Sequence, residues 1–447
     1  MSGFITNGSE YNGLESTDIV TRPLKEQMLP EGIRVVSTER ASSIKLPFFG
    51  RLTKLLMPYS DGWQGGSGSP KVQKKMTLSE FKAEVKYSKQ DYADTILEAA
   101  TNLGGVSQNE ITGTNVHDAE IFVFNNGIQH DIWRYMWLGD TTKRHDSAGT
   151  YPDGSTTYAI GDADKYYNQI DGLWKSLIDQ SADYDSATED QVRRITIANG
   201  AVAEVDTVTM TGTSGTANVT IKGKEYLATF DTDLTTTAAN FVTAYAAELA
   251  QRRITCTSSV ADIVLTSSIA GVDLGTTSVA NVSGNLAGSK ADTTGNTEAA
   301  DLTTDEALST FKLMYRNSTE QLRSIGKKDL RFWVTESMYF NYEDTLTSGG
   351  TEQARTQLVD GVERYTYNGI PIIPVQIDEL ITSDFEGGYP HRAILSTPQN
   401  MALVVSTGNN FAETRFWFNP DANENRQRTQ FEFGADFVLP ELVTVAY

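Results

Sequence analysis

The chain has 447 residues, a formal net charge of −21 and a single cysteine, Cys256. The acidic charge argues against a surface that grips nucleic-acid phosphates, which needs clustered lysine and arginine. The lone cysteine excludes an internal disulfide and a cysteine-based zinc site. There is neither a secretion-signal pattern nor an apolar run of the roughly 20 residues that span a membrane, so we expect a soluble chain made in a reducing cytoplasm.

The first part of the chain predicts extended structure with little core of its own. Residues 1–45 are polar and broken by prolines, which is typical of an arm that becomes ordered only against its own domain or a neighbouring copy. Strand-like runs follow at 50–59 and 72–87, separated by a glycine- and serine-rich stretch. We expect a long two-stranded hairpin with a flexible tip, resting on a partner because a lone hairpin is marginal in water. A helix is expected over residues 88–104.

The strongest helical pattern lies in residues 117–144. Its apolar residues recur at three- and four-residue steps, which predicts one long amphipathic helix over residues 118–138. These residues are Ile121, Phe124, Ile128, Ile132 and Tyr135. We expect Gly139 to form a left-handed C-cap, with Lys143 and Arg144 at the negative end of the helix dipole. Additional tryptophans widen the apolar stripe, so the helix is expected to pack on two sides. A loop over residues 145–165 and a short helix over 166–178 follow.

The composition changes between about residues 193 and 286, where charges thin out and threonine, valine, alanine and serine dominate. Period-two patterns predict strands at 205–210, 217–221, 225–230, 254–258 and 262–267, with a helix over 236–250. The flanks, 181–190 and 287–301, read as loops. This organisation predicts a compact α+β module inserted into a loop of a host domain.

The host domain then resumes with a helix over 304–325, a buried strand over 330–335 and a helix over 337–346. The dipeptide Asn368-Gly369 predicts a tight hairpin between strands 362–367 and 370–375. Pro371 and Pro374 favour an edge position or a bulge for its second strand. Further strands are expected at 392–397, 401–406, 414–418, 429–437 and 442–446.

No catalytic signature is present: the sequence lacks a nucleophile elbow, a phosphate-binding loop and a zinc-protease motif. His130 and Asp131 could be a base and its orienter, but neighbours on a helix point apart, so a solvated helix face is favoured. The acidic run that contains Asp183, Asp185, Glu189 and Asp190 favours a solvated linker over a metal site. We expect no enzyme, no catalytic residue and no cofactor. A hydrolase using scattered carboxylates is a competing class.

One weak metal candidate exists near the C-terminus. Asp421, Asn423, Asn425 and Glu432 match positions 1, 3, 5 and 12 of a calcium loop. The sixth position, which needs glycine for its sharp turn, is Arg426. The segment also runs into a strand-like pattern, so a turn that leads into a strand is favoured over a cation site.

The expected hairpin supplies the candidate residues for contacts between subunits. Trp63 is an aromatic among glycines at the tip, either tucked locally or anchored in a neighbour's pocket, since aromatics dominate buried contact energy. Lys54, Lys71, Phe81 and Tyr87 lie in or near the same hairpin.

The order of these parts resembles the major capsid proteins of tailed bacteriophages, which have the HK97-type fold. Four stretches carry the resemblance: residues 50–87 are similar to its extended loop, 118–140 to its spine helix, 364–376 with 393–405 to its axial-domain strands, and 431–447 to its closing strand. Residues 207–249 resemble an insertion found in capsid and other proteins of phages of Bacteroidetes hosts, including the crAss-like group.

The resemblance implies an α+β chain in five parts. These are an N-terminal arm (1–45), an extended β-hairpin loop (46–88), a peripheral domain with the spine helix (89–190), an inserted α+β domain (191–300) and an axial domain (301–447) whose C-terminal strand returns to the peripheral domain. The inserted domain could be a surface decoration, a docking platform for auxiliary head proteins or a contact across local symmetry axes.

The implied function is structural. Hexamers and pentamers of the chain would form an icosahedral head around phage double-stranded DNA, bound without sequence specificity. The expected partners are a portal, head auxiliary or decoration proteins and, because the chain opens directly with the arm, a separate scaffolding protein. The chain would be made in the host bacterial cytoplasm and reside in the virion, with no membrane partner. A carbohydrate-binding or adhesive surface protein is the alternative, suggested by the threonine-rich module.

Overall fold

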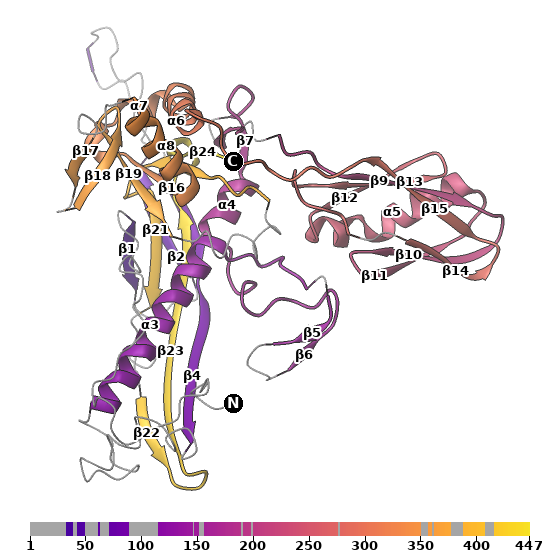
Figure 1. Cartoon of the computed structure of the whole chain (residues 1–447), viewed down its shortest axis with the longest axis horizontal. Coiled ribbons are helices and arrows are strands. Elements are labelled where there is room, and N and C mark those ends of the chain that lie inside the picture. Colours follow the sequence, from indigo (N-terminus) through magenta and orange to yellow (C-terminus); the bar gives the residue numbers. More distant parts are fainter. Residues whose placement is uncertain are drawn as a thin grey trace.

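A computed structural model describes most of the chain. The described residues are 33–38, 43–49, 61–62, 71–88, 115–145, 147–151, 156–188, 191–197, 200–275, 278–349, 356–359, 362–376, 388–406 and 415–447. Within them the chain forms three parts, which are visible in Figure 1 as an elongated limb, a sheet with helices at one end of it, and a module that projects sideways.

The limb is a five-stranded sheet with one long helix beside it (Figure 1). The strands are β1 (Arg34–Thr38), β4 (Ser79–Ser88), β21 (Met401–Ser406), β22 (Arg415–Asn419) and β23 (Glu424–Phe437), and the helix is α3 (Asn115–Leu138). Strand β23 is central: β21 and β22 pair with its two ends on one side, and β4 runs antiparallel to it on the other. Strand β1 adds to β21 in parallel. We call this sheet the limb sheet.

The second part is an eight-stranded mixed sheet. Its order is β17 (Thr356–Val359), β18 (Val362–Tyr367), β19 (Ile370–Val375), β16 (Arg331–Thr335), β20 (Ala393–Ser396), β24 (Thr444–Ala446), β8 (Val192–Ile195) and β7 (Ser181–Asp183). One face packs against α6 (Glu306–Asn317), α7 (Glu320–Ser324) and α8 (Glu336–Ser348) in a core that includes Phe311, Phe332 and Tyr342.

The opposite face of the eight-stranded sheet shares a core with the limb. The C-terminal end of α3 and the short helix α4 (Leu173–Asp179) contribute Trp137 and Trp174, both fully buried. Trp333 of β16 and Phe433 of β23 belong to the same cluster. This core therefore joins the two sheets, and the last turns of α3 are at its centre.

The third part, which we call the inserted module, runs from β9 (Val205–Thr211) to β15 (Ala287–Thr294). It contains β10 (Gly215–Ile221), β11 (Lys224–Thr229), α5 (Leu234–Gln251), β12 (Ile254–Ser259), β13 (Asp262–Ser267) and β14 (Ser278–Gly284). Two sheets, β11-β10-β14 and β12-β13-β9-β15, enclose their own apolar core with α5. Neither sheet shares a strand with the rest of the described chain. The boundaries given above for domains stay predictions.

The α+β class is confirmed, as are the elements with the clearest local patterns. Helix α3 covers the predicted residues, and Phe124 and Tyr135 of its predicted apolar face are buried. Strands β18 and β19 form the predicted hairpin, with Asn368 and Gly369 at φ 54° and 80°, the positive values that a tight two-residue turn requires.

The end of the long helix differs from the expectation. Gly139 does not have the positive φ of a left-handed cap. A side chain there would meet the carbonyl oxygen of Ile170 at 2.5 Å, so glycine is needed for close packing. The helix ends at Leu138 with no basic residue in its last turn, so Lys143 and Arg144 lie beyond it. Its two-sided packing is confined to the C-terminal end, because Phe122 and Val123 near the other end are exposed.

The extended hairpin also differs from its prediction. Residues 72–87 divide into β3 (Lys71–Thr77) and β4, which have different partners. Strand β3 pairs with β2 (Ser43–Phe49), whereas β4 pairs with β23. The predicted first strand, 50–59, and the helix predicted over residues 88–104 lie outside the described residues, apart from Ser88, which ends β4.

Four smaller expectations are wrong. The helix over 304–325 breaks at Ser318, where Thr319 caps a new helix by accepting a hydrogen bond from the backbone N–H of Leu322. The flank 287–301 begins with β15, which pairs with β9. The short helix expected over 166–178 starts at Leu173. Strand β19 lies inside its sheet despite Pro371 and Pro374, because its pairing with β18 ends at Pro371 and its pairing with β16 starts only at Ile372.

The last strand has a mixed position. Strand β24 lies in the eight-stranded sheet between β20 and β8. Its neighbours Val443 and Tyr447 nevertheless belong to the core around the end of α3. The strand that runs along the limb is β23 instead (Figure 1).

Candidate assembly surfaces

The outer side of α3 carries the first candidate surface. Phe124 is 6% exposed, whereas its neighbours Phe122 and Val123 are each 50% exposed. The start of the helix is held on the limb sheet, since the ring of His117 packs edge-on against that of Phe416 on β22 with centroids 4.5 Å apart. Helix α3 therefore leaves two large apolar side chains together on the solvent side of the limb, as expected for a surface that contacts another chain.

The second candidate is strand β4. Its burial alternates, with Phe81, Ala83 and Val85 turned inward and Lys82 and Lys86 exposed. Among the described residues β4 pairs only with β23, so no described strand occupies its other edge. An unoccupied strand edge is able to pair with a further strand.

Paired charges cover the outward face of β4 and β23. Lys86 binds Glu424 at 2.9 Å, and Arg426 binds the same carboxylate at 3.1 Å. Hydrogen bonds from Lys86 and Arg426 lower the pKa of Glu424 below its ordinary value. Arg428 lies 3.8 Å from Glu84. The Arg428–Glu84 pair is exposed and contributes little to stability, whereas Glu424 is only 9% exposed between its two partners. Charged side chains along an edge oppose indiscriminate strand pairing.

The structure places the predicted contact residues as follows. Phe81 stacks on Phe433 with ring centroids 4.3 Å apart and meets Tyr135 of α3 edge-on at 4.9 Å. Tyr87 is 3% exposed. Within its own chain Tyr87 is buried and Phe81 is partly buried. Contact of these residues with a neighbouring copy stays a prediction. Lys71 begins β3, opposite Phe49. Trp63 and Lys54 lie outside the described residues.

Strands β2 and β3 likewise find a core within their own chain. Leu46, Met76 and Leu78 pack with Ala402 and Val404 of β21. The described parts of this region, residues 33–38, 43–49 and 71–88, therefore rest on the limb of their own chain, which is the first of the two alternatives expected for the arm. Surfaces for contact with other copies must be sought on the outer sides of the limb.

The inserted module meets the limb through the segment that follows α3. Gly139 and Gly172 cross closely, with the Gly172 N–H donating to the Gly139 carbonyl at 2.8 Å. The next residue, Asp140, is 3% exposed and pairs with Arg253 of the module at 2.6 Å. Burial raises the pKa of Asp140, but Arg253 and hydrogen bonds from Thr142 outweigh it and hold the pKa below the ordinary value.

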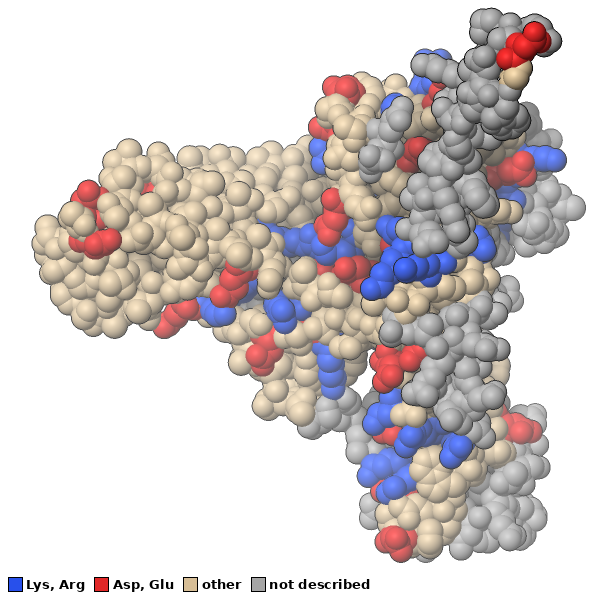
Figure 2. Space-filling model, turned by 180° about the vertical axis from the view of Figure 1, so that it is seen from behind, with Lys and Arg blue, Asp and Glu red and all other residues tan. Residues whose placement is uncertain are grey.

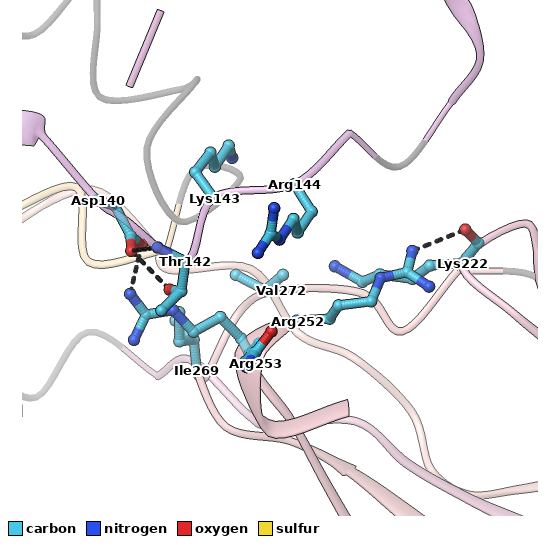
Figure 3. Close-up of a pocket in the computed structure, with 10 residues that line it drawn as sticks. Asp140, Thr142, Lys143, Arg144, Lys222, Arg252, Arg253, Ile269 and Val272 are labelled. Carbon is cyan, nitrogen blue, oxygen red and sulfur yellow. Dashed lines mark hydrogen bonds and ion pairs between the residues drawn. The ribbon is translucent and has the colours of Figure 1, made fainter. Parts of the chain in front are cut away.

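Basic residues surround this junction. A small cavity between the two parts is lined by Lys143 and Arg144 from the limb side and by Lys222, Arg252 and Arg253 from the module. In Figure 3, Arg144 and Lys222 reach into it from opposite sides. Figure 2 shows Lys and Arg gathered where the module joins the body, whereas the rest of the module on that face carries few charges. Sequence reasoning missed this site because its residues come from segments far apart in the chain, from Asp140 to Val272.

The calcium-loop candidate is not assembled. Asp421 and Asn423 lie in the turn between β22 and β23, and Asn425 and Glu432 lie in β23 itself. Seven extended residues separate the last two by about 23 Å, too far for one ion. The preferred interpretation, a turn that leads into a strand, is correct.

A different acidic group was missed. Glu204, Asp206 and Asp292 bring carboxylate oxygens within 4.8 Å of one another. The ammonium group of Lys290 already lies among them, 3.2 Å from Asp206 and 2.7 Å from Asp292. Lys290 therefore supplies the positive charge that a cation would otherwise provide. The sequence pattern predicts a loop here, whereas Lys290 and Asp292 lie on strand β15, which pairs with β9.

The other polar candidates have structural partners. Asp131 binds Arg134 at 3.0 Å on the surface of α3, and His130 lies 4.0 Å from it. Asp183 binds Arg194 at 2.6 Å across neighbouring strands. Glu189 and Asp190 lie outside the described residues. Within the described ranges, no helix is both long and apolar enough to cross a bilayer.

Comparison with known proteins gives structural matches only. No protein-family model matches the chain, and no curated protein sequence does so. The capsid structure of cyanophage P-SCSP1u is similar over 99% of this chain and 92% of its own, with a TM-score of 0.44 and 10% identity. The capsid of the myovirus phage XM1 is similar over 98% and 99%, with a TM-score of 0.41 and 11% identity. The SrpI encapsulin of Synechococcus elongatus matches over 96% and 91%, with a TM-score of 0.38 and 8% identity.

Proposed function

We propose that this chain is the major capsid protein of a tailed bacteriophage, with an HK97-type fold, and that it assembles into the icosahedral head that encloses double-stranded DNA. The order of parts that the sequence resemblance implies supports the proposal: strands from the N-terminal region, a long helix, an inserted module and a sheet with flanking helices follow one another in the chain.

The shape of the described part of the chain carries the proposal. The limb is an elongated sheet with one long helix beside it, and the inserted module projects sideways from the body (Figure 1). A subunit of this extended shape has broad outer sides for contact with other copies, as a wall built from repeated subunits requires.

The outer side of α3 is the surface through which we expect one copy to contact another. Phe122 and Val123 present apolar side chains on the limb, and burying both against a second copy would stabilise the contact by about 2 kcal/mol. Contacts of this size are weak singly but hold a closed shell when repeated over many copies, and their weakness permits correction of misplaced subunits.

This function implies particular assembly units, partners and a location for the chain. Hexamers and pentamers would be the assembly units, with a portal, a scaffold and head auxiliary proteins as partners, no membrane, and the virion as the final location after synthesis in the bacterial cytoplasm. The negative net charge of the chain suits a wall that encloses DNA without adhering to it.

The threonine-rich module does not favour the adhesive alternative. Hydroxyl groups pair across neighbouring strands, as Thr207 does with Thr293 at 2.6 Å and Thr216 with Ser283 at 2.8 Å. Cross-strand pairs of this kind stabilise a sheet, so they account for the composition without a carbohydrate ligand.

Electron microscopy and sedimentation of the purified chain, with and without a scaffolding protein, test the proposal. We expect rings, sheets or closed particles from the wild type. The double variant Phe122→Ser/Val123→Ser should shift the population toward free subunits. The matched control Val260→Ser removes a side chain that is 73% exposed on the module, and it should assemble like the wild type. A strictly monomeric wild type at high concentration under both conditions would overturn the proposal.

A further inference from the structure

Three polar side chains form a row across the limb sheet, one from each of three neighbouring strands. Glu432 of β23 lies directly opposite Glu80 of β4 on one side and directly opposite Ser406 of β21 on the other. Residues that are directly opposite in an antiparallel pair project from the same face of the sheet, with Cβ atoms about 4.5–5.5 Å apart. The side-chain oxygens of the three residues are therefore able to meet above this face.

Two members of the row are buried. Glu432 is 5% exposed and Ser406 is fully buried, whereas Glu80 is exposed. The next residue of β23 on this face, Gly434, lies under the end of β3, because a Cβ atom there would be 2.4 Å from the carbonyl oxygen of Thr77. The row is therefore open to solvent at Glu80 and shielded at its other two members.

The buried members have oxygen atoms without a partner. Within the described part of the chain, neither Oε2 of Glu432 nor the hydroxyl group of Ser406 makes a hydrogen bond, although both atoms are shielded from solvent. Leaving a buried polar atom in this state costs stability, and the cost is larger when the group is charged. A ligand that binds both oxygens would remove this cost.

No lysine or arginine of the described residues neutralises either carboxylate of the row. Lys82, on the same face of β4, binds Glu84 at 2.9 Å. Lys74 of the covering strand β3 binds Asp436 at 3.1 Å. The row therefore places two carboxylates directly opposite each other without a cation, and like charges in this arrangement are destabilising.

A hard divalent cation satisfies all three side chains at once. Carboxylate and hydroxyl oxygens suit calcium, which accepts irregular geometry and takes about 6–8 oxygen ligands, including water. Water can complete this set from the solvent-exposed side, at Glu80. A single proton shared between the carboxylates would reduce their repulsion but would leave the hydroxyl group of Ser406 without a partner.

We propose that Glu80, Glu432 and Ser406 bind one calcium ion, with water as the remaining ligands. The two carboxylates supply the negative charge, and the hydroxyl group supplies an oxygen from the buried side. Because these ligands belong to β4, β23 and β21, the bound ion cross-links three strands of the limb sheet. Glu432 thus belongs to a different set of ligands from the calcium-loop spacing, which grouped it with Asp421. This inference does not depend on the function proposed above.

Calorimetric titration and thermal melting of the full chain test it, after removal of divalent ions with a chelator. Calcium chloride is the probe, and sodium chloride at equal ionic strength is the reference. We expect calcium to bind with a dissociation constant of about 0.1–1 mM, as in sites of low affinity, and to raise the melting temperature.

The variant Glu432→Gln keeps the size of the side chain and removes its charge. It should bind calcium at least about tenfold more weakly, since one lost charged ligand contributes on the order of a factor of ten. In chelator alone it should melt at or above the wild-type temperature, because the repulsion with Glu80 is gone. A folded variant of this kind separates loss of the ion from loss of the fold.

The control variants Asp421→Asn and Asp292→Asn remove exposed carboxylates from the turn before β23 and from the acidic group of the module, and both should keep the full response to calcium. The assignment is overturned if the wild type shows no calcium binding up to about 10 mM, or if Glu432→Gln binds calcium as the wild type does. A melting temperature that rises on mild acidification, without any response to calcium, would show a shared proton instead and would overturn it as well.

Discussion

The close crossing of Gly139 and Gly172 gives a sharp prediction about stability. The Cβ atom of an alanine at position 139 would lie 2.5 Å from the carbonyl oxygen of Ile170 and 2.7 Å from that of Tyr135. Ordinary contacts of this kind are about 3.4 Å, so the backbone of one element must move by nearly 1 Å in a tightly packed core. We expect Gly139→Ala to destabilise the folded state by about 3 kcal/mol.

Gly127, which lies inside α3, provides the control. An alanine side chain at Gly127 would meet nothing within 4 Å. Glycine inside a helix costs about 1 kcal/mol relative to alanine, mainly through the flexibility of the unfolded chain. Gly127→Ala should therefore stabilise the protein by up to about 1 kcal/mol. The same glycine-to-alanine substitution should therefore stabilise the protein at position 127, inside α3, and destabilise it at position 139, directly after the end of α3.

Differential scanning calorimetry on the unassembled chain measures both changes. For the host part of the chain, 3 kcal/mol corresponds to a fall of roughly 6–12 °C in melting temperature. If Gly139→Ala melted within about 1 °C of the wild type, the crossing would be looser than described and the role given to this glycine would be wrong. A fall with Gly127→Ala would contradict the view that this part of α3 has open space beside it.

Three further predictions concern separate parts of the chain. Arg253→Met should cost about 3 kcal/mol, because Asp140 stays buried without its partner. The wild-type pKa of Asp140 is lowered, so the stability from this pair is present at neutral pH and is lost as the pH falls below about 4. Melting temperatures measured over a pH series should therefore differ between wild type and variant at neutral pH and converge in acid. Burial raises the pKa of Cys256 to about 12, so a thiol reagent at pH 8 should label it only after denaturation. Gly369→Ala should cost about 1 kcal/mol in chemical denaturation, because position 369 has φ 80°.

Local patterns in the sequence predicted the elements whose stability is itself local. The apolar period of α3, the alternation in β4 and the Asn368-Gly369 turn depend on nearest neighbours, and the structure contains all three. The break at Ser318 also had a local signal: a threonine followed by glutamate is a common start of a helix, and Thr319 takes that role.

Other elements depend on partners that are distant in sequence. Strands β14 and β15 consist mainly of small and polar residues and are largely exposed, so they show neither an apolar alternation nor an apolar run. They are strands because β10 and β9 offer them paired edges. The edge position predicted from Pro371 and Pro374 is wrong for the same reason. A proline lacks a backbone N–H, and whether a strand loses a hydrogen bond by this depends on where its pairing with each neighbour begins and ends.

The candidate sites divide in a similar way. A four-residue match to a calcium loop was read from spacing alone, and strand geometry carries its last residue, Glu432, away from the turn. The residues that line the cavity at the junction of limb and module follow no regular spacing in the sequence. Arg144 and Lys222, for example, become neighbours only when the module packs against the segment after α3. Sequence patterns therefore identify sites within one element better than sites between elements.

The placement of β1 to β4 changes where assembly contacts should be sought. Had these strands lacked partners, neighbouring copies would have been needed to bury Met76, Phe81 and Tyr87. The limb does this itself, so folding of the described strands needs no second chain. The subunit can fold first and associate afterwards through surfaces that stay exposed, such as Phe122 and Val123 on α3. Substitutions on that surface should then reduce assembly without lowering the melting temperature of the free subunit, whereas substitutions at Met76 or Phe81 should lower both.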